Sequence, residues 1–282
     1  MYSISIENAK GNRIQLSQNK DYSITSITGL NPPSANINTG VNASFDGATF
    51  KSSRLNVRNI VIMLAIEGNV EQNRINLYRF IKVKQACTVY FKNNTREVYI
   101  GGYVESMEIG IFEQKQIVQI SIICPKPYFT DVLDEEAVFS SVIPLFEFPF
   151  SIPEEGIEFG ELNVNSAIDV INNGDIATGM VIEFYATDEV TDPAIYNLET
   201  NEYMKLNVTL QAGDRIQINT EKGNKSVTKI SGGVRTNILN ALDAGSSWLI
   251  LESGDNIMTY TATVHPEYLS CTVYHNDLYE GV

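Results

Sequence analysis

Short runs with apolar residues at alternate positions recur along the whole chain. In the first half they include Tyr2 to Ile6, Val98 to Val104 and Ile117 to Ile123. Alternation with a period of two is typical of strands that bury one face. Turn-forming residues stand between the runs, for example Lys10-Gly11-Asn12 and Phe45-Asp46-Gly47. The pattern therefore predicts short strands joined by tight turns, as in β-barrels and β-sandwiches.

The second half of the chain repeats this pattern from Ile168 onward. Eight or so predicted strands fall within about 115 residues, which is the number expected for a jelly roll or a similar sandwich. The runs that predict them are Ile168 to Ile171, Met180 to Tyr185, Ala194 to Leu198, Leu206 to Leu210, Arg215 to Asn219, Val227 to Ile230, Trp248 to Leu251 and Met258 to Val264. The chain is therefore expected to be mainly β in both halves.

Two segments predict helices within this β-rich chain. Asn69 can cap a helix, with Gln72 three residues later, which places a helix at about residues 70–84. Its apolar face would consist of Ile75, Leu77, Tyr78 and Ile81. A second, short helix is predicted at Asn237 to Asp243, where Ile238, Leu239 and Leu242 could pack on a sheet. Both helices are interpreted as packing elements.

A boundary between two domains is predicted between Asp131 and Pro153. The acidic triplet Asp134-Glu135-Glu136 is followed by an apolar aromatic run, and three prolines between Pro144 and Pro153 favour extended chain. A length of 282 residues is enough for two domains with separate cores. The prediction is a first domain at residues 1–133, a linker at 134–153 and a second domain at 154–282.

Charge is divided unevenly between the two halves. Residues 1–133 hold 14 Lys and Arg against 10 Asp and Glu, whereas residues 134–282 hold 6 against 24, so that net charges of +4 and −18 give −14 overall. An acidic second half is repelled by phosphate backbones and by anionic lipid, which disfavours binding to nucleic acid or membranes. No run approaches the roughly 18 apolar residues of a membrane span, and no signal peptide is recognisable, so synthesis in a cytoplasm is expected.

Motifs that carry enzymatic chemistry are missing from the sequence. It contains no phosphate-binding glycine loop, no G-x-G-x-x-G, no H-E-x-x-H and no G-x-S-x-G. His265 and His275, with Asp277, could form a metal pair or part of a triad, but two histidines at strand ends explain them as well. Glu154-Glu155 and Asp134-Glu135 are interpreted as solvated acidic loops. No catalytic, cofactor-binding or metal-binding residue is therefore predicted, and no cofactor.

The cysteines and most aromatic residues are interpreted as packing residues of the core. Cys87, Cys124 and Cys271 are far apart and odd in number, so they are interpreted as reduced, buried residues. The chain has 14 Tyr, 12 Phe and a single Trp, Trp248. Exposed aromatic rings in a sandwich can stack on sugars or anchor a protein interface, although most aromatic residues in strands belong to the core. Trp248 is accordingly a candidate surface residue.

A series of short fragments occurs in a characteristic order along nearly the whole chain. In the first half these fragments are Glu67-Gly68-Asn69 through Phe80-Ile81, Tyr99 to Glu105, and Ile123 to Asp131. In the second half they are Phe148 to Pro153, Ile171 to Asp175, Tyr196 to Thr200 leading into Met204 to Leu206, Gly213 to Asn219, Gly223 to Val227 and Leu251 to Asn256. Their Asn-Gly-Asp and Gly-Asp-Asn clusters look like sandwich corners, since they favour turns with positive φ. In their order and spacing, these fragments together resemble the distal tail protein family of phages that infect Gram-positive bacteria.

This resemblance implies a structural subunit of a long non-contractile tail, and not an enzyme. It implies an N-terminal split β-barrel with one helix, which forms a homo-hexameric ring, and a C-terminal galectin-like or carbohydrate-module-like sandwich. The implied partners are the tail tube protein, the tail-associated lysin or fibre protein, and receptor-binding or other baseplate proteins. The implied location is the tail tip of a virion made in the cytoplasm of a bacterial host.

Two other functions stay open at the level of sequence. The second domain could bind cell-wall polysaccharide through Trp248 or exposed tyrosines, or the chain could be a wall hydrolase. The shortage of histidines counts against the hydrolase. Within the ring interpretation, the loop from Thr28 to Gly40 and the helix at 70–84 are expected near subunit contacts.

Overall fold

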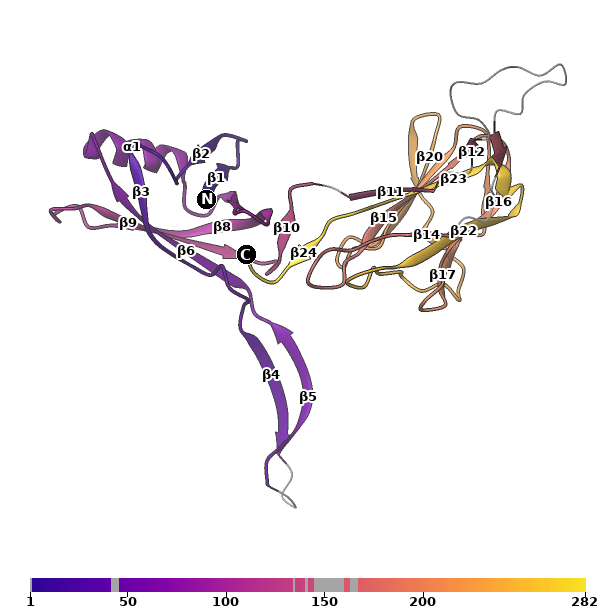
Figure 1. Ribbon diagram of the computed structural model, residues 1–282, viewed down its shortest axis with the longest axis horizontal. Coiled ribbons are helices and arrows are strands. Elements are labelled where there is room, and N and C mark those ends of the chain that lie inside the picture. Colours follow the sequence, from indigo (N-terminus) through magenta and orange to yellow (C-terminus); the bar gives the residue numbers. More distant parts are fainter. Residues whose placement is uncertain (1, 42–45, 134, 140–141, 145–159, 163–166) are drawn as a thin grey trace. The chain divides into compact units, whose positions relative to one another are not determined.

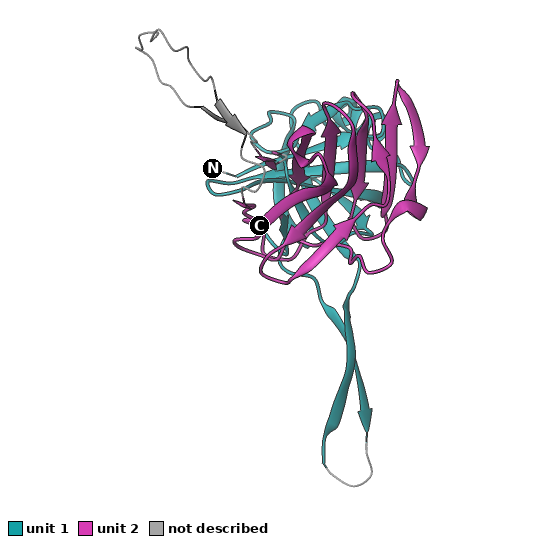
Figure 2. Cartoon of the chain, turned by 90° about the vertical axis from the view of Figure 1, so that its right-hand side faces the viewer, with its two compact units in different colours: residues 1–132, 278–282 teal, residues 133–277 magenta. Residues whose placement is uncertain are grey.

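The computed structural model describes residues 2–41, 46–133, 135–139, 142–144, 160–162 and 167–282. It confirms a mainly β fold with several sheets and one α-helix within this part of the chain. The chain divides into two compact units (Figures 1 and 2). Unit 1 comprises Met1–Val132 and Leu278–Val282, and unit 2 comprises Leu133–Asp277.

Unit 1 contains one large sheet whose central path runs β2-β1-β7-β8-β9-β6-β3, with β10 paired to β8 and to β24. Every pairing in it is antiparallel. The strands are β1 Ser3–Asn8, β2 Arg13–Gln15, β3 Tyr22–Thr28, β6 Arg58–Ile66, β7 Ala86–Lys92, β8 Glu97–Ile109, β9 Ile117–Cys124, β10 Phe129–Asp131 and β24 Leu278–Tyr279.

The alternation seen in the sequence creates the core of unit 1. Ile60, Ile62 and Leu64 on β6 are fully buried, as are Ile120 and Ile122 on β9. Cys87 and Cys124 lie in the same core, and burial raises the pKa of Cys87 to about 12 and that of Cys124 to about 11. The third cysteine, Cys271, is buried in unit 2, so the prediction of free, buried cysteines is confirmed.

Helix α1, Val70–Phe80, begins where the sequence predicts and ends earlier. Its N-cap is Asn69, whose side chain accepts a hydrogen bond from the main-chain N–H of Gln72. Leu77 is buried against the sheet. The helix stops because Ile81 adopts an extended conformation and enters the core, and Lys84 takes a positive φ of 68°. Tyr78, predicted on the apolar face, is instead exposed.

A long hairpin extends away from the sheet of unit 1 (Figure 1). It consists of β4, Ala35–Val41, and β5, Ala48–Leu55, which form a two-stranded sheet of their own. The sequence predicts a turn near Asp46 and a loop from Thr28 to Gly40, whereas β4 begins at Ala35 within that loop. We call these two paired strands, residues 35–41 and 48–55, the arm.

Unit 2 contains two main sheets that share one hydrophobic core. One has the order β11-β23-β15-β19-β20-β21, and the other β14-β22-β16-β17 with β18 paired to β16. Their strands are β11 Glu135–Phe139, β14 Ile168–Asp169, β15 Met180–Ala186, β16 Val190–Asn197, β17 Glu202–Lys205, β18 Thr209–Leu210, β19 Arg215–Asn219, β20 Ser226–Ser231, β21 Val234–Asn237, β22 Ile257–Val264 and β23 Leu269–His275. A short pair, β12 Val142–Pro144 and β13 Gly160–Leu162, stands apart from both.

Some predicted elements of unit 2 take a different form. The helix predicted at Asn237 to Asp243 is a single 3₁₀ turn, η1, at Leu239–Ala241, and Leu239 is exposed while its neighbours pack on the core. The segment Trp248 to Leu251 forms only an isolated bridge, Thr178 to Leu251. A second 3₁₀ turn, η2 Pro266–Tyr268, precedes β23.

The units also differ in extent from the predicted domains. β11 lies within the predicted linker, yet it pairs with β23 from Glu135↔His275 to Phe139↔Cys271 and is part of unit 2. The last five residues fall in the predicted second domain, but β24 pairs with β10 in unit 1. Both differences arise from pairings over long sequence separations, for which local patterns carry no signal. The split-barrel and galectin-like descriptions stay predictions.

Candidate interaction surfaces

The arm is the most exposed element of unit 1. Its burial pattern is exposed at nearly every position of both strands, so neither face packs on a core. Three apolar side chains lie open, with exposed fractions of 63% for Ile37, 87% for Val41 and 62% for Phe50. A two-stranded hairpin is at best marginally stable in water, and its free edges invite pairing with another chain. The arm therefore fits a contact with a partner.

Arg58 ties together the segments at the base of the arm. It is 2% exposed, and its guanidinium donates four hydrogen bonds, all to main-chain carbonyls. Nη1 reaches Gly29 at 2.5 Å and Asn31 at 2.7 Å, Nε reaches Pro127 at 2.7 Å, and Nη2 reaches Glu280 at 2.6 Å. Burial lowers the pKa of Arg58. The residue fixes where the chain enters and leaves the arm.

Gly29 permits a close approach at the same place. It has a φ of +87°, and a Cβ there would lie 2.1 Å from the carbonyl oxygen of Asn59. Any other residue would displace the start of β6, Arg58–Ile66. The arm thus leaves the sheet at a base that is closely packed and hydrogen-bonded.

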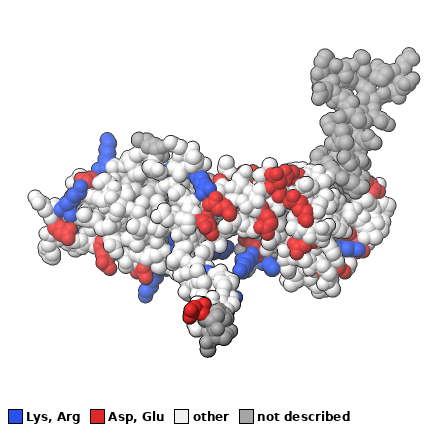
Figure 3. Space-filling view, turned by 60° about the horizontal axis from the view of Figure 1, so that its bottom comes forward, with Lys and Arg blue, Asp and Glu red and all other residues white. Residues whose placement is uncertain are grey.

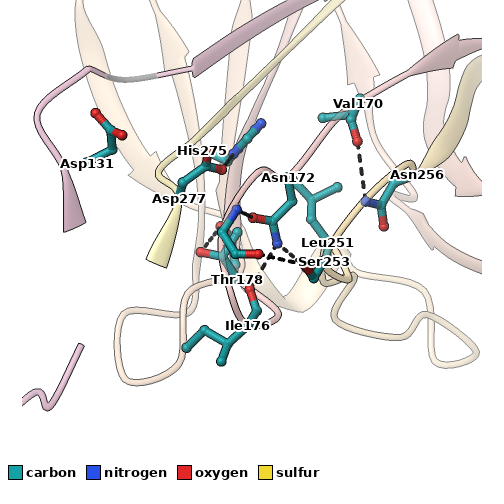
Figure 4. Close-up of polar contacts among 12 residues, drawn as sticks. Asp131, Val170, Asn172, Ile176, Thr178, Leu251, Ser253, Asn256, His275 and Asp277 are labelled. Atoms are coloured by element: carbon teal, nitrogen blue, oxygen red, sulfur yellow. Dashed lines mark hydrogen bonds and ion pairs between the residues drawn. The ribbon is translucent and has the colours of Figure 1, made fainter. Parts of the chain in front are cut away.

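Two corners of unit 2 interlock through buried asparagines (Figure 4). Asn172 and Asn256 are each 1% exposed. The Asn172 amide donates to the carbonyls of Ile176 at 3.0 Å and Leu251 at 3.1 Å, while its main chain pairs with Gly254 in both directions at 2.9 Å. These are the Asn-Gly-Asp and Gly-Asp-Asn clusters of the sequence.

The second asparagine closes its own turn in the same way. Asn256 accepts from the N–H of Glu252 at 2.9 Å and donates to the carbonyls of Glu252 at 2.9 Å and Gly254 at 3.0 Å. Its main-chain N–H donates to Asp169 Oδ1 at 2.9 Å. Buried amides that are satisfied by main-chain groups stabilise turns. These contacts give both asparagines a structural role in their corners.

The two histidines lie at different places in the fold. His265 is exposed, has a φ of 55°, and its Nδ1 lies 3.0 Å from Glu267 Oε1, just before η2. His275 is the last residue of β23 and is 4% exposed, with Nδ1 3.5 Å from Asp277 Oδ1. Burial lowers the pKa of His275, and the carboxylates of Asp277 and Glu135 oppose that shift. No group of three potential metal ligands occurs among the described residues.

The other sequence candidates are accounted for as follows. Glu154-Glu155 and Asp134 fall outside the described residues, and Glu135 lies in β11. Trp248 is half-buried against the core of unit 2, and Lys225 Nζ lies 5.0 Å from the centre of its ring. The core and this lysine leave less of the ring exposed than the sequence suggests.

Acidic side chains gather over unit 2 on the face shown in Figure 3. This agrees with the 24 Asp and Glu against 6 Lys and Arg in residues 134–282. In the described part of the chain, no helix has the length and apolarity to cross a membrane.

The sequence of unit 2 matches a known domain family. Residues 173–279 fit the family model described as siphovirus-type tail component, C-terminal domain. This stretch begins within the first interlocked corner and contains the second. Residues 173–279 are therefore similar to the C-terminal domain of siphovirus-type tail components. The resemblance to the distal tail protein family is confirmed by this match together with the likeness of fold below.

Solved structures resemble the whole chain in fold, including unit 1. The SPP1 Dit (gp 19.1) protein, described as a paradigm of the hub adsorption apparatus of phages that infect Gram-positive bacteria, aligns with a TM-score of 0.69 at 13% identity over 99% of each chain. The phage P2 baseplate in its activated conformation with Ca aligns at 0.53 and 12% identity over 100% of each chain. The Sr form aligns at 0.51 and 11% over 98% of each chain. Among curated proteins, no match is found.

Sequence reasoning missed the arm as a structured element and missed Arg58. The strands of the arm show no alternation of buried and exposed side chains. An alternating hydrophobic pattern therefore cannot predict them. A single arginine before a strand gives no local signal, because its partners lie up to 222 residues away.

Proposed function

We propose that this protein is a structural hub subunit at the distal end of a long non-contractile phage tail. Six copies form a ring that joins the tail tube protein to the tail-associated lysin or fibre protein and to receptor-binding or other baseplate proteins. The fold shared with hub and baseplate proteins, and the domain match over residues 173–279, support this role. The subunit performs no catalysis and acts in the virion.

The observation that carries ring formation is the arm. An isolated chain would leave Ile37, Val41 and Phe50 in water on a ribbon with two free edges. Burying these side chains against a neighbouring copy recovers apolar contact, at roughly 25 cal/mol for each Å² removed from water. A head-to-tail contact of this kind generates a closed ring when the rotation between neighbouring copies is a whole-number fraction of a full turn.

The test compares oligomeric state with and without the arm. Multi-angle light scattering at several concentrations, with negative-stain images of the same samples, should show hexamers or ring-shaped particles for the full chain. Replacing residues 35–55 with an Asn-Gly turn should give monomers, and Phe50→Ser with Ile37→Thr should weaken assembly without lowering the melting temperature. Lys51→Ser, an exposed change on the same strand, is the matched control.

Assembly that survives loss of the arm would show that the contact lies elsewhere. A strict monomer at every concentration, with no ring on addition of purified tail tubes, would contradict the hub. In that case the alternative function gains weight, in which unit 2 binds cell-wall polysaccharide. A glycan array with the full chain and with Trp248→Ala tests this alternative, since lost binding would place the sugar at Trp248.

A further inference from the structure

A shallow hollow lies on the outer surface of the sheet of unit 1. It has a volume of about 220 Å³, and its floor consists of small residues, including Ala9, Ala86 and Gly101. Tyr103, 53% exposed, stands at its side. The floor therefore brings bare strand backbone to the surface beside an open aromatic ring.

The glycine pair in this floor has two different explanations. Gly102 faces the core, where a Cβ would lie 2.7 Å from Ile122 Cγ2 and 2.9 Å from Cys124 Sγ. Gly101 faces outward, and a Cβ there would meet nothing within 4 Å. Glycine inside a strand weakens it, and where packing does not require it, it often marks a place where another chain approaches closely. Among the described residues, no neighbour requires a glycine at position 101.

A second hollow, of about 260 Å³, adjoins the first and shares Asn8 with it. Lys10, Arg79 and Lys82 line it, and all three are exposed. No acidic residue lines this hollow, and no ion pair to these three cations occurs among the described residues. Asn8 donates from Nδ2 to the carbonyl of Phe80 at 3.3 Å. This hydrogen bond holds the end of β1 against the end of α1 at the side of the hollow.

We propose that the two hollows together bind an extended, acidic segment of a different polypeptide. The main chain of this segment would lie over Gly101 beside Tyr103. Any side chain at position 101 would prevent this close approach. Carboxylates of the same segment would enter the hollow of Lys10, Arg79 and Lys82. A phosphate-bearing polymer would need only the cations and would leave the bare floor unused. The proposal does not rest on ring formation.

The test uses a fluorescein-labelled octapeptide of alternating Glu and Val, with the Gln-Val peptide as its uncharged match. Fluorescence anisotropy with the full chain should show saturable binding of the Glu-Val peptide alone. Arg79→Glu with Lys82→Glu should weaken it by about tenfold or more, because the charges then repel. Gly101→Val should weaken it by about fivefold through loss of close approach, with an unchanged or higher melting temperature. Lys126→Glu, an exposed control in unit 1, should bind as the wild type does.

Other outcomes overturn the proposal. Three results would each exclude it. The Gln-Val peptide could bind as tightly as the Glu-Val peptide, or no binding could saturate. Alternatively, neither Gly101→Val nor the charge reversal would change the affinity. Competition by tripolyphosphate with no effect of Gly101→Val would identify a phosphate site instead. Release of assembled copies by the peptide, seen as a fall in mass by light scattering, would identify the occupant as a second copy. Should the charge reversal fail to fold, Arg79→Gln with Lys82→Gln replaces it.

Discussion

Arg58 donates from Nη2 to the main-chain carbonyl of Glu280 at 2.6 Å, although 222 residues separate them in sequence. The same side chain holds Gly29 and Asn31, so one guanidinium joins the base of the arm to the end of the described chain. The guanidinium carbon of Arg58 also lies 4.5 Å from the centre of the Phe129 ring. Unit 1 thus depends on residues that the chain supplies only after it has completed unit 2.

Replacing Arg58 with Lys should destabilise unit 1 strongly. A lysine keeps the charge but cannot reach four carbonyls arranged around a planar fork, so several buried acceptors would lose their donors. The expected cost is about 3–5 kcal/mol. Urea unfolding followed by hydrogen exchange of the sheet of unit 1 measures it. Arg54→Lys, an exposed change on β5, should cost less than about 0.5 kcal/mol, and an equal loss for both would contradict this account.

The adjacent glycines on β8 should respond in opposite directions to alanine. Gly102→Ala places a methyl group against Ile122 and Cys124 in a filled core, at an expected cost of about 1–3 kcal/mol. Gly101→Ala meets open space and lowers the entropy of the unfolded chain, for an expected gain of about 0.4–1 kcal/mol. Thermal and urea unfolding of both variants decide this. Destabilisation by Gly101→Ala would mean that the outer face of β8 is packed in the free protein.

Substitution of Asn256 should destabilise unit 2 strongly, because its side-chain amide is buried and fully hydrogen-bonded. Asn256→Ala removes the side-chain contacts to Glu252, Gly254 and Val170 from a buried turn, with an expected loss of about 2–3 kcal/mol. Denaturant unfolding measures the loss. Asn173→Ala lies in the partner corner but is exposed, so it should change stability by less than about 0.5 kcal/mol. A similar loss in both variants would show that the turns tolerate the missing amide.

Local patterns predicted the elements that bury one face. Ile117 to Ile123 alternates because β9 packs on the core, and Asn69 begins α1 because its side chain satisfies a free N–H of the first turn. The corner clusters at Asn172 and Asn256 were also recognisable, since Asn and Gly favour the required turns. These features depend on residues within a few positions of one another.

Features that depend on distant residues could not be predicted in this way. β24 belongs to unit 1 because Phe129 pairs with Tyr279, and no pattern near Tyr279 specifies that partner. The arm lacks a buried face, so its strands resemble loop sequence. The exposed hollow around Gly101 depends on neighbours contributed by three separate strands and turns.

Acidification should weaken unit 2 through His275. Burial lowers the pKa of this imidazole below its ordinary value of 6.5, and Asp277 and Glu135 offset only part of that shift. Between the two pKa values the unfolded chain binds more protons than the folded one, so the free energy of unfolding rises with pH there and falls as the pH drops below about 6.5. His275→Gln removes the titration, so the difference in urea stability between wild type and variant should change between pH 7.5 and 5. A pH-independent difference for His275→Gln would show that the buried imidazole does not change its charge on unfolding.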